Sequence, residues 1–152
     1  MPAYKSQQTL KREKAEAAAE EEQPFQDRPV KILVMDDDEM ICDVVSQMLE
    51  KTGFFVETAP DGEDAVKMYK QSMDAGASFD VVIMDLTIPG GIGGKEAVKE
   101  LLAIDPKAIA IVSSGYADDP VMADYAEYGF KAIIAKPYTL GNLRKVLNQV
   151  LK

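Results

Sequence analysis

Five short apolar runs alternate along this chain with longer segments in which apolar residues recur at the spacing of a helix. The runs cover residues 30–36, 54–59, 79–85, 108–115 and 131–137. They are rich in β-branched residues, and several are apolar at successive positions, which is typical of strands covered on both faces. Strands that alternate with helices in this way predict an α/β fold, with one parallel sheet and helices on both of its faces.

The segments between the runs carry signals for the ends of helices. The first has an apolar stripe over residues 41–49, and Gly53 follows it as a stop. Asp61 and Thr139 are candidate N-caps, because their side-chain oxygens can accept hydrogen bonds from amides of the first turn. The segment 119–128 opens with Asp-Pro, an N-cap followed by a proline at the first helical position, and predicts a short helix.

The third run, "VVIMDLTIPGG" (81–91), places a charged residue, Asp85, at the end of a buried strand. Such a carboxylate is either a cap or a reactive group within reach of a ligand. In open α/β sheets, ligands bind beyond the carboxyl ends of the strands. The polar residues at those ends are Asp36, Asp37, Asp38, Asp85, Ser113, Ser114 and Lys136. All are expected at one rim of the sheet.

The acidic residues of this rim predict a metal site. We expect the strand order 2-1-3-4-5, the flavodoxin-like doubly wound order, in which the first and third strands are neighbours about 4.8 Å apart. Asp85 then lies close to Asp36 or Asp37, and like charges at such a distance repel each other. Mg²⁺ suits a set of oxygen ligands at an accessible rim. A solvated acidic loop is the alternative interpretation of "DDD", and the position at the strand ends favours the metal.

A metal, a carboxylate, a hydroxyl and a lysine on one rim are together the components of phosphoryl transfer to an aspartate. Asp85 would attack the phosphorus in line, while Lys136 would place a positive charge on a phosphoryl oxygen and Ser114 would donate a hydrogen bond. Mg²⁺ would neutralise and orient the phosphoryl oxygens. The predicted reaction therefore uses every polar group of the rim.

Four motifs, in order and at the predicted strand ends, resemble the response-regulator receiver domains of two-component signalling. They are "LVMDDDE", "VVIMDLTIP", "IVSSGY" and "AKPY", and the resemblance covers residues 30–152. It implies that Asp85 is the phosphoacceptor, assisted by Ser114 and Lys136. It also implies a partner, a histidine kinase or a histidine phosphotransfer protein, whose phosphohistidine supplies the phosphoryl group, and slow loss of that group to water.

The resemblance also implies the ligands of the metal. Asp37 and Asp85 would bind Mg²⁺ directly together with the backbone carbonyl of Thr87, and Asp36 would act mainly through water. The peptide bond between Lys136 and Pro137 is expected to be cis.

Two features depart from the common receiver pattern. The loop "IPGGIGG" (88–94) is one residue longer. Ile133 stands three residues before Lys136, where receivers often carry Tyr or Phe. We therefore expect no aromatic rotamer switch at that position, so any switching would involve Ser114 and the loop after it.

Composition limits the partners. With 17 Lys and Arg against 26 Asp and Glu, the net charge of -9 opposes direct binding to nucleic acid or an anionic membrane. No run approaches the roughly 20 apolar residues of a membrane span, and no secretion signal opens the chain, so we expect a cytoplasmic protein. There is no histidine, so phosphohistidine must come from a partner. The single cysteine, Cys42, is expected to be a core residue without a redox role.

Residues 1–29 read as a charged, Ala-rich linker with no apolar face to bury, either disordered or a connecting helix. The start "MPAY" and this linker resemble the join between the ATPase domain and the C-terminal receiver of hybrid histidine kinases. A freestanding regulator with an N-terminal extension is the alternative. Because the sequence ends soon after Tyr138, we expect no output domain to follow.

Other classes of protein fit less well. A receiver-like docking module that is never phosphorylated would not need the full set of Asp37, Asp85, Ser114 and Lys136. A phosphatase with an aspartate nucleophile normally has a general acid two residues later, where Thr87 stands, and needs a cap domain for which no sequence remains. The loop "GGIGGK" lacks the first glycine and the final Ser or Thr of a P-loop. We therefore expect a signalling domain rather than an enzyme.

Overall fold

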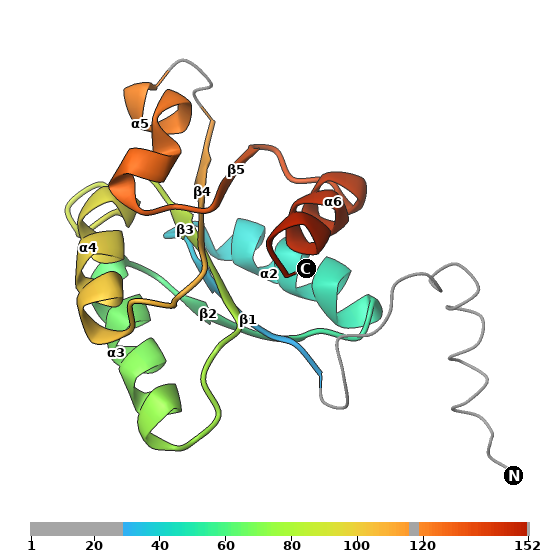
Figure 1. The fold of residues 1–152 in the computed structure, drawn as a ribbon. Helices are drawn as coiled ribbons and strands as arrows, with labels where there is room; N and C mark the ends of the chain where they lie inside the picture. The colour runs from blue at the N-terminus through green and yellow to red at the C-terminus, as the bar shows by residue number, and fades with distance from the viewer. Residues whose placement is uncertain (1–28, 116–118, 152) are drawn as a thin grey trace, which may run out of the picture.

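The computed structural model describes residues 29–115 and 119–151 (Figure 1). Within them one sheet contains the strands β1 (Lys31–Met35), β2 (Phe55–Ala59), β3 (Val81–Asp85), β4 (Ala110–Ser114) and β5 (Ala132–Ala135). The order is β2-β1-β3-β4-β5, and every neighbouring pair is parallel. This confirms the expected α/β fold and the flavodoxin-like strand order. Except for Pro29, the predicted linker 1–29 lies outside the described residues.

Helices cover both faces of the sheet (Figure 1). They are α2 (Glu39–Lys51), α3 (Gly62–Asp74), α4 (Gly94–Ile104), α5 (Pro120–Ala123), the 3₁₀ helix η2 (Tyr125–Tyr128) and α6 (Leu140–Leu151). On one face, Leu49 of α2 and Leu147 of α6 belong to the same buried cluster as Ile83 of β3. On the other face, Leu101 of α4 and Val121 of α5 belong to a second cluster. The sheet therefore lies between two separate layers of apolar packing.

The inner strands are covered on both sides, whereas the edge strand β5 is not. Every residue of β3 and β4 is buried, while β5 alternates between buried and exposed positions. The hydrogen-bonded ladder is shorter than the apolar runs, because residues just outside it still pack in the core. Phe79 precedes β3 and Ala108 precedes β4, and both are buried in the cluster under α3 and α4. Apolar periodicity thus marks the strands but not their ends.

The segment 119–128 differs from the single short helix expected. It divides into α5 and η2, because Asp124 leaves helical geometry with φ -110° and ψ 35°. Its predicted N-cap is present, since the Asp119 carboxylate accepts a hydrogen bond from the amide of Val121 at 3.0 Å. Gly129, with φ 104°, ends η2 in the left-handed region that favours glycine.

The predicted N-caps of two longer helices are confirmed. The Asp61 carboxylate accepts from the amide of Asp64 at 2.9 Å, and the Thr139 hydroxyl accepts from the amide of Asn142 at 3.1 Å. Asp38 caps α2 in the same way and accepts from the amide of Met40 at 3.0 Å. These caps satisfy amides that would otherwise lack partners in the first turn.

Alternation along the strands directs the polar residues at their ends to one face. Successive side chains of a strand point to opposite faces, so residues two apart share a face. Val34, Ile83, Ile111 and Ile134 all pack in the cluster beneath α2 and α6. The residues two positions further along are Asp36, Asp85, Ser113 and Lys136. The scaffold therefore carries two carboxylates, a hydroxyl and an ammonium to one corner of the molecule.

Cys42 is a core residue, as expected. Its side chain is buried in α2, and the thiol donates a hydrogen bond to the backbone oxygen of Asp36 at 3.4 Å. Burial, together with the charge of Asp36, raises the pKa of the thiol to about 11. The thiol is therefore protonated at neutral pH and is a poor nucleophile.

Two further expectations concern the backbone and the membrane. The peptide bond between Lys136 and Pro137 is cis, which confirms the expectation drawn from the resemblance. Across residues 29–115 and 119–151, none of the helices combines the length and the apolar character that crossing a bilayer demands.

The loop between β3 and α4 follows Asp85 directly, and glycine allows it to close on itself. A Cβ atom placed on Gly93 would lie 2.3 Å from the backbone oxygen of Leu86, and one on Gly94 would lie 3.1 Å from that of Asp85. Real Cβ atoms do not approach backbone oxygen to the first of these distances. Gly93 therefore permits the close return of the chain that fixes where this loop leaves β3.

Gly93→Ala should lower the free energy of unfolding by about 1–3 kcal/mol, because backbone must move to admit the methyl group. Urea denaturation monitored by circular dichroism measures the change. Gly141→Ala is the matched control: it lies in α6 with open space around the added atom, and alanine favours the helix. Equal stability of the Gly93 variant and the wild type would show that the loop has no such tight return.

Candidate functional site

Three aspartates converge where β1 and β3 end. Asp36 and Asp85 are buried, with 2% and 6% of their surface exposed, whereas Asp37 is exposed. One carboxylate oxygen of each lies within 4.8 Å of the others. The parallel register of β1 with β3 produces this arrangement, because Met35 is paired with Met84 and the aspartates follow one residue later. The acid cluster predicted from the strand ends is therefore present.

Lys136 holds two of these carboxylates together. Its ammonium lies 2.8 Å from Oδ2 of Asp36 and 3.2 Å from Oδ2 of Asp85. Oδ1 of Asp36 accepts a hydrogen bond from the amide of Asp38 at 2.9 Å. Both oxygens of Asp36 are thus engaged by protein groups, so Asp36 is the least suited of the three aspartates to direct contact with a metal.

The electrostatics of the cluster favour added positive charge. Burial raises the pKa of Asp85, and the neighbouring charge of Asp36 raises it further, although Lys136 opposes both effects. For Lys136, burial disfavours the charged form, but the hydrogen bond to Asp36 and the charges of Asp85 and Asp36 outweigh it and raise the pKa. One ammonium among three carboxylates leaves a negative excess. A divalent cation with oxygen ligands would remove it.

Ser114 and Thr87 occupy different environments beside the cluster. Ser114 is buried at the end of β4, where it pairs with Ala135, and its backbone oxygen accepts from the amide of Lys136 at 3.0 Å. Thr87 is exposed in the loop after Asp85. Strand β4 therefore fixes the main chain of the lysine, while Thr87, two residues after Asp85, is open to solvent.

Sequence reasoning missed a hydrogen bond beneath the cluster. The hydroxyl of Tyr138 donates to Oγ of Ser113 at 2.6 Å, and Ser113 has no exposed surface. Ser113 is the residue of β4 paired with Asp85, so it projects from the same face as the carboxylates. Period-two alternation places Ser113 on this face, but its hydrogen bond with Tyr138 depends on the tertiary fold. Tyr138 thereby ties the chain just beyond Lys136 to β4.

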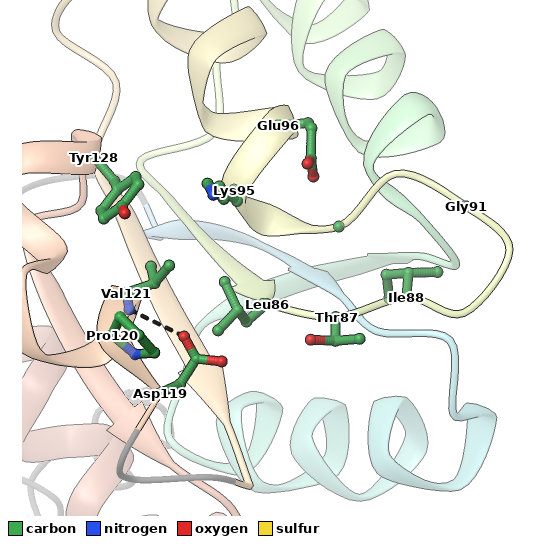
Figure 2. A pocket seen from close by; sticks show the side chains of 11 residues that line it. Leu86, Thr87, Ile88, Gly91, Lys95, Glu96, Asp119, Pro120, Val121 and Tyr128 are labelled. Atoms are coloured by element: carbon green, nitrogen blue, oxygen red, sulfur yellow. Dashed lines mark hydrogen bonds between the residues drawn. The ribbon is translucent and has the colours of Figure 1, made fainter.

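A pocket of about 530 Å³ adjoins the loop that follows β3, and Thr87 is among its lining residues. Figure 2 shows it between the loop after β3, the first turn of α4 and the start of α5. The ammonium of Lys95 lies 5.5 Å from the centre of the Tyr128 ring, a contact that links α4 with η2. None of the three clustered aspartates lines this pocket, but Thr87, two residues after Asp85, does.

The chain matches the family model described as "Response regulator receiver domain" over residues 32–148. It is 31% identical over 123 residues to the chemotaxis protein CheY of Thermotoga maritima, covering 80% of this chain and 98% of that protein. It is also 29% identical over 121 residues to a cyclic di-GMP phosphodiesterase of the same organism, covering 80% of this chain but only 31% of the relative. Similar domains thus occur alone and within longer proteins.

Solved structures share the fold. The complex of CheX and CheY with BeF3 and Mg from Borrelia burgdorferi gives a TM-score of 0.75 at 26% identity, covering 82% of this chain and 91% of that chain. A receiver domain protein from Clostridium thermocellum gives a TM-score of 0.72 at 27% identity, covering 80% and 94%. The match to the family model, the strand order and the acid cluster all agree. The chain belongs to the response regulator receiver domain family.

Proposed function

We propose that the chain is a phosphoacceptor in two-component signalling, in which Asp85 receives a phosphoryl group from a phosphohistidine on a histidine kinase or a histidine phosphotransfer protein. The observation that carries the proposal is the contact of Lys136 with Asp85 inside a cluster of three aspartates. Burial favours protonation of a carboxylate, but the ammonium of Lys136 opposes this effect at Asp85, and the exposed Asp37 leaves the cluster open to solvent. Such a group can remain charged and still meet a ligand.

The transfer step is a substitution at phosphorus. A carboxylate oxygen of Asp85 forms the new P–O bond, the P–N bond of the phosphohistidine breaks, and the departing ring nitrogen keeps the electron pair. Lys136 would move its ammonium from the carboxylate to a phosphoryl oxygen, and Ser114 would donate its hydroxyl hydrogen to another. Hydrolysis later returns Asp85 to the carboxylate and releases phosphate, so the chain turns over its own modification rather than a separate substrate.

The residues of the cluster fit Mg²⁺. Their donor atoms are carboxylate oxygens close enough to share one ion, and Asp37 gives solvent access to it. We propose Asp37, Asp85 and the backbone carbonyl of Thr87 as direct ligands, with Asp36 acting through water because its oxygens contact Lys136 and the amide of Asp38. When bound, Mg²⁺ neutralises and orients the phosphoryl oxygens.

The setting of the domain is a separate proposal. We favour a receiver from a hybrid histidine kinase, on the resemblance of the charged linker, with a freestanding regulator as the alternative. We also propose a cytoplasmic location. Because the net charge is -9, we expect recognition of a protein donor and no direct binding of nucleic acid or membrane.

Asp85→Asn should abolish covalent phosphorylation, because it replaces the nucleophilic carboxylate with a neutral amide of the same shape. Wild type and variant would be incubated with Mg²⁺ and acetyl phosphate, and intact mass measured. Asp74→Asn, at the exposed end of α3, is the matched control and should be phosphorylated like the wild type. A phosphoryl group that still appears on the Asp85→Asn protein would remove Asp85 from this role. Addition to none of the three would favour an unphosphorylated docking module.

Lys136→Met should slow phosphorylation of Asp85 by about 100-fold, because one preorganised charge on the phosphoryl group is lost. Rapid-quench sampling with acetyl phosphate measures the rate. Lys131→Met, exposed just before β5, removes the same charge away from the cluster and should leave the rate unchanged. Circular dichroism verifies that both variants are folded. Equal rates for the two variants would show that Lys136 only balances charge in the resting protein.

A further inference from the structure

A second hollow lies at the opposite end of the sheet from the acid cluster. It has a volume of about 590 Å³, and we call it the N-terminal groove. Its lining residues are Pro29, Lys31, Phe55, Gly76, Ala77, Ser78 and Asp80. They come from the amino ends of β1 and β2 and from the connection between α3 and β3 (Figure 1). Nothing in the phosphoryl-transfer site uses this groove.

An exposed aromatic ring forms part of the groove. Phe55, the first residue of β2, is 48% exposed, which is high for a phenylalanine in a strand. The ammonium of Lys31 is fixed beneath it, because it donates to the backbone oxygen of Ala77 at 2.6 Å and lies 4.8 Å from the centre of the Phe79 ring. It also lies 5.8 Å from the centre of the Phe55 ring. The exposed part of Phe55 is therefore a preformed surface for another apolar group.

We propose that the chain itself covers this groove, through the segment 24–28, "PFQDR", with Phe25 packed against Phe55. Pro29 lines the groove, so the chain enters the domain at the surface to be covered. Phe25 is four residues before it and is the only aromatic residue in positions 5–28. Closing so short a loop costs little conformational entropy, and the effective concentration of Phe25 at the groove is high.

Other occupants are less well supported. A second copy of the chain would have to displace a segment that is covalently tethered next to the groove. A separate protein would meet the same competition. Residues 1–23 are mainly Ala, Glu, Gln and Lys, so they have little apolar surface that could cover the groove in place of Phe25. A docked Phe25 would hold the preceding chain at the edge strand β2, away from the acid cluster, and would set the direction in which the linker leaves the domain.

The chain has no tryptophan, so Phe55→Trp places a single fluorescent reporter on the groove. In the full chain carrying this substitution, Phe25→Ala should shift the tryptophan emission to longer wavelength and increase its quenching by acrylamide. Tyr4→Ala is the matched control, because it removes an aromatic residue that precedes the domain but is far from Pro29 in the sequence, and it should change neither signal. All three proteins would be measured over a range of concentrations.

Hydrogen exchange of residues 76–80 in chains that keep Phe55 provides a second measurement. Phe25→Ala should speed exchange there, and Tyr4→Ala should not. Three results would overturn the proposal: no response of either measurement to Phe25→Ala, an equal response to Tyr4→Ala, or shielding of the introduced tryptophan that depends on protein concentration. The last would assign the groove to a second copy of the chain. None of these readings depends on phosphorylation, so they stand apart from the test of Asp85.

Discussion

The contact of one ammonium with two buried carboxylates is the interaction on which the site depends. The ammonium of Lys136 lies 2.8 Å from a carboxylate oxygen of Asp36 and 3.2 Å from one of Asp85. It neutralises part of the negative charge that β1 and β3 bring together at their ends. Removing one member of such a group leaves an uncompensated buried charge, which is costly. The same shortage of positive charge makes the corner attractive to a cation and to the phosphoryl group that we propose Asp85 accepts.

The rest of the fold brings these groups together and holds them. Strand alternation sends Asp36, Asp85 and Lys136 to the face beneath α2 and α6, and apolar packing of the residues two positions earlier anchors each strand. Behind the lysine, Tyr138 is hydrogen-bonded to Ser113, and the backbone of Lys136 is bonded to β4. Hydrogen bonds to β4 therefore fix both the backbone of Lys136 and the chain just after it, while its ammonium contacts the carboxylates.

Much of this arrangement could be predicted from the sequence, because it follows from short-range patterns. Apolar runs and caps indicated the strands and helices, and the rule that ligands bind at strand ends brought Asp36, Asp37, Asp85 and Lys136 to one rim. What escaped prediction depends on local backbone angles and on tertiary contacts. The split of residues 119–128 arises from the backbone geometry of Asp124, and the bond of Tyr138 to Ser113 joins residues 25 positions apart. The need for glycine at position 93 appears only once the loop has closed on Leu86.

Calorimetric titration with Mg²⁺ tests the central claim, that crowded carboxylates make this corner a cation site, most directly. The account predicts saturable uptake of one ion by the wild type and loss of most of the affinity in Asp37→Asn, whose exposed side chain can change without disturbing the core. Asp43→Asn, which removes an equal charge from an exposed position of α2, should bind like the wild type. No uptake by the wild type, or equal affinity in all three proteins, would contradict it.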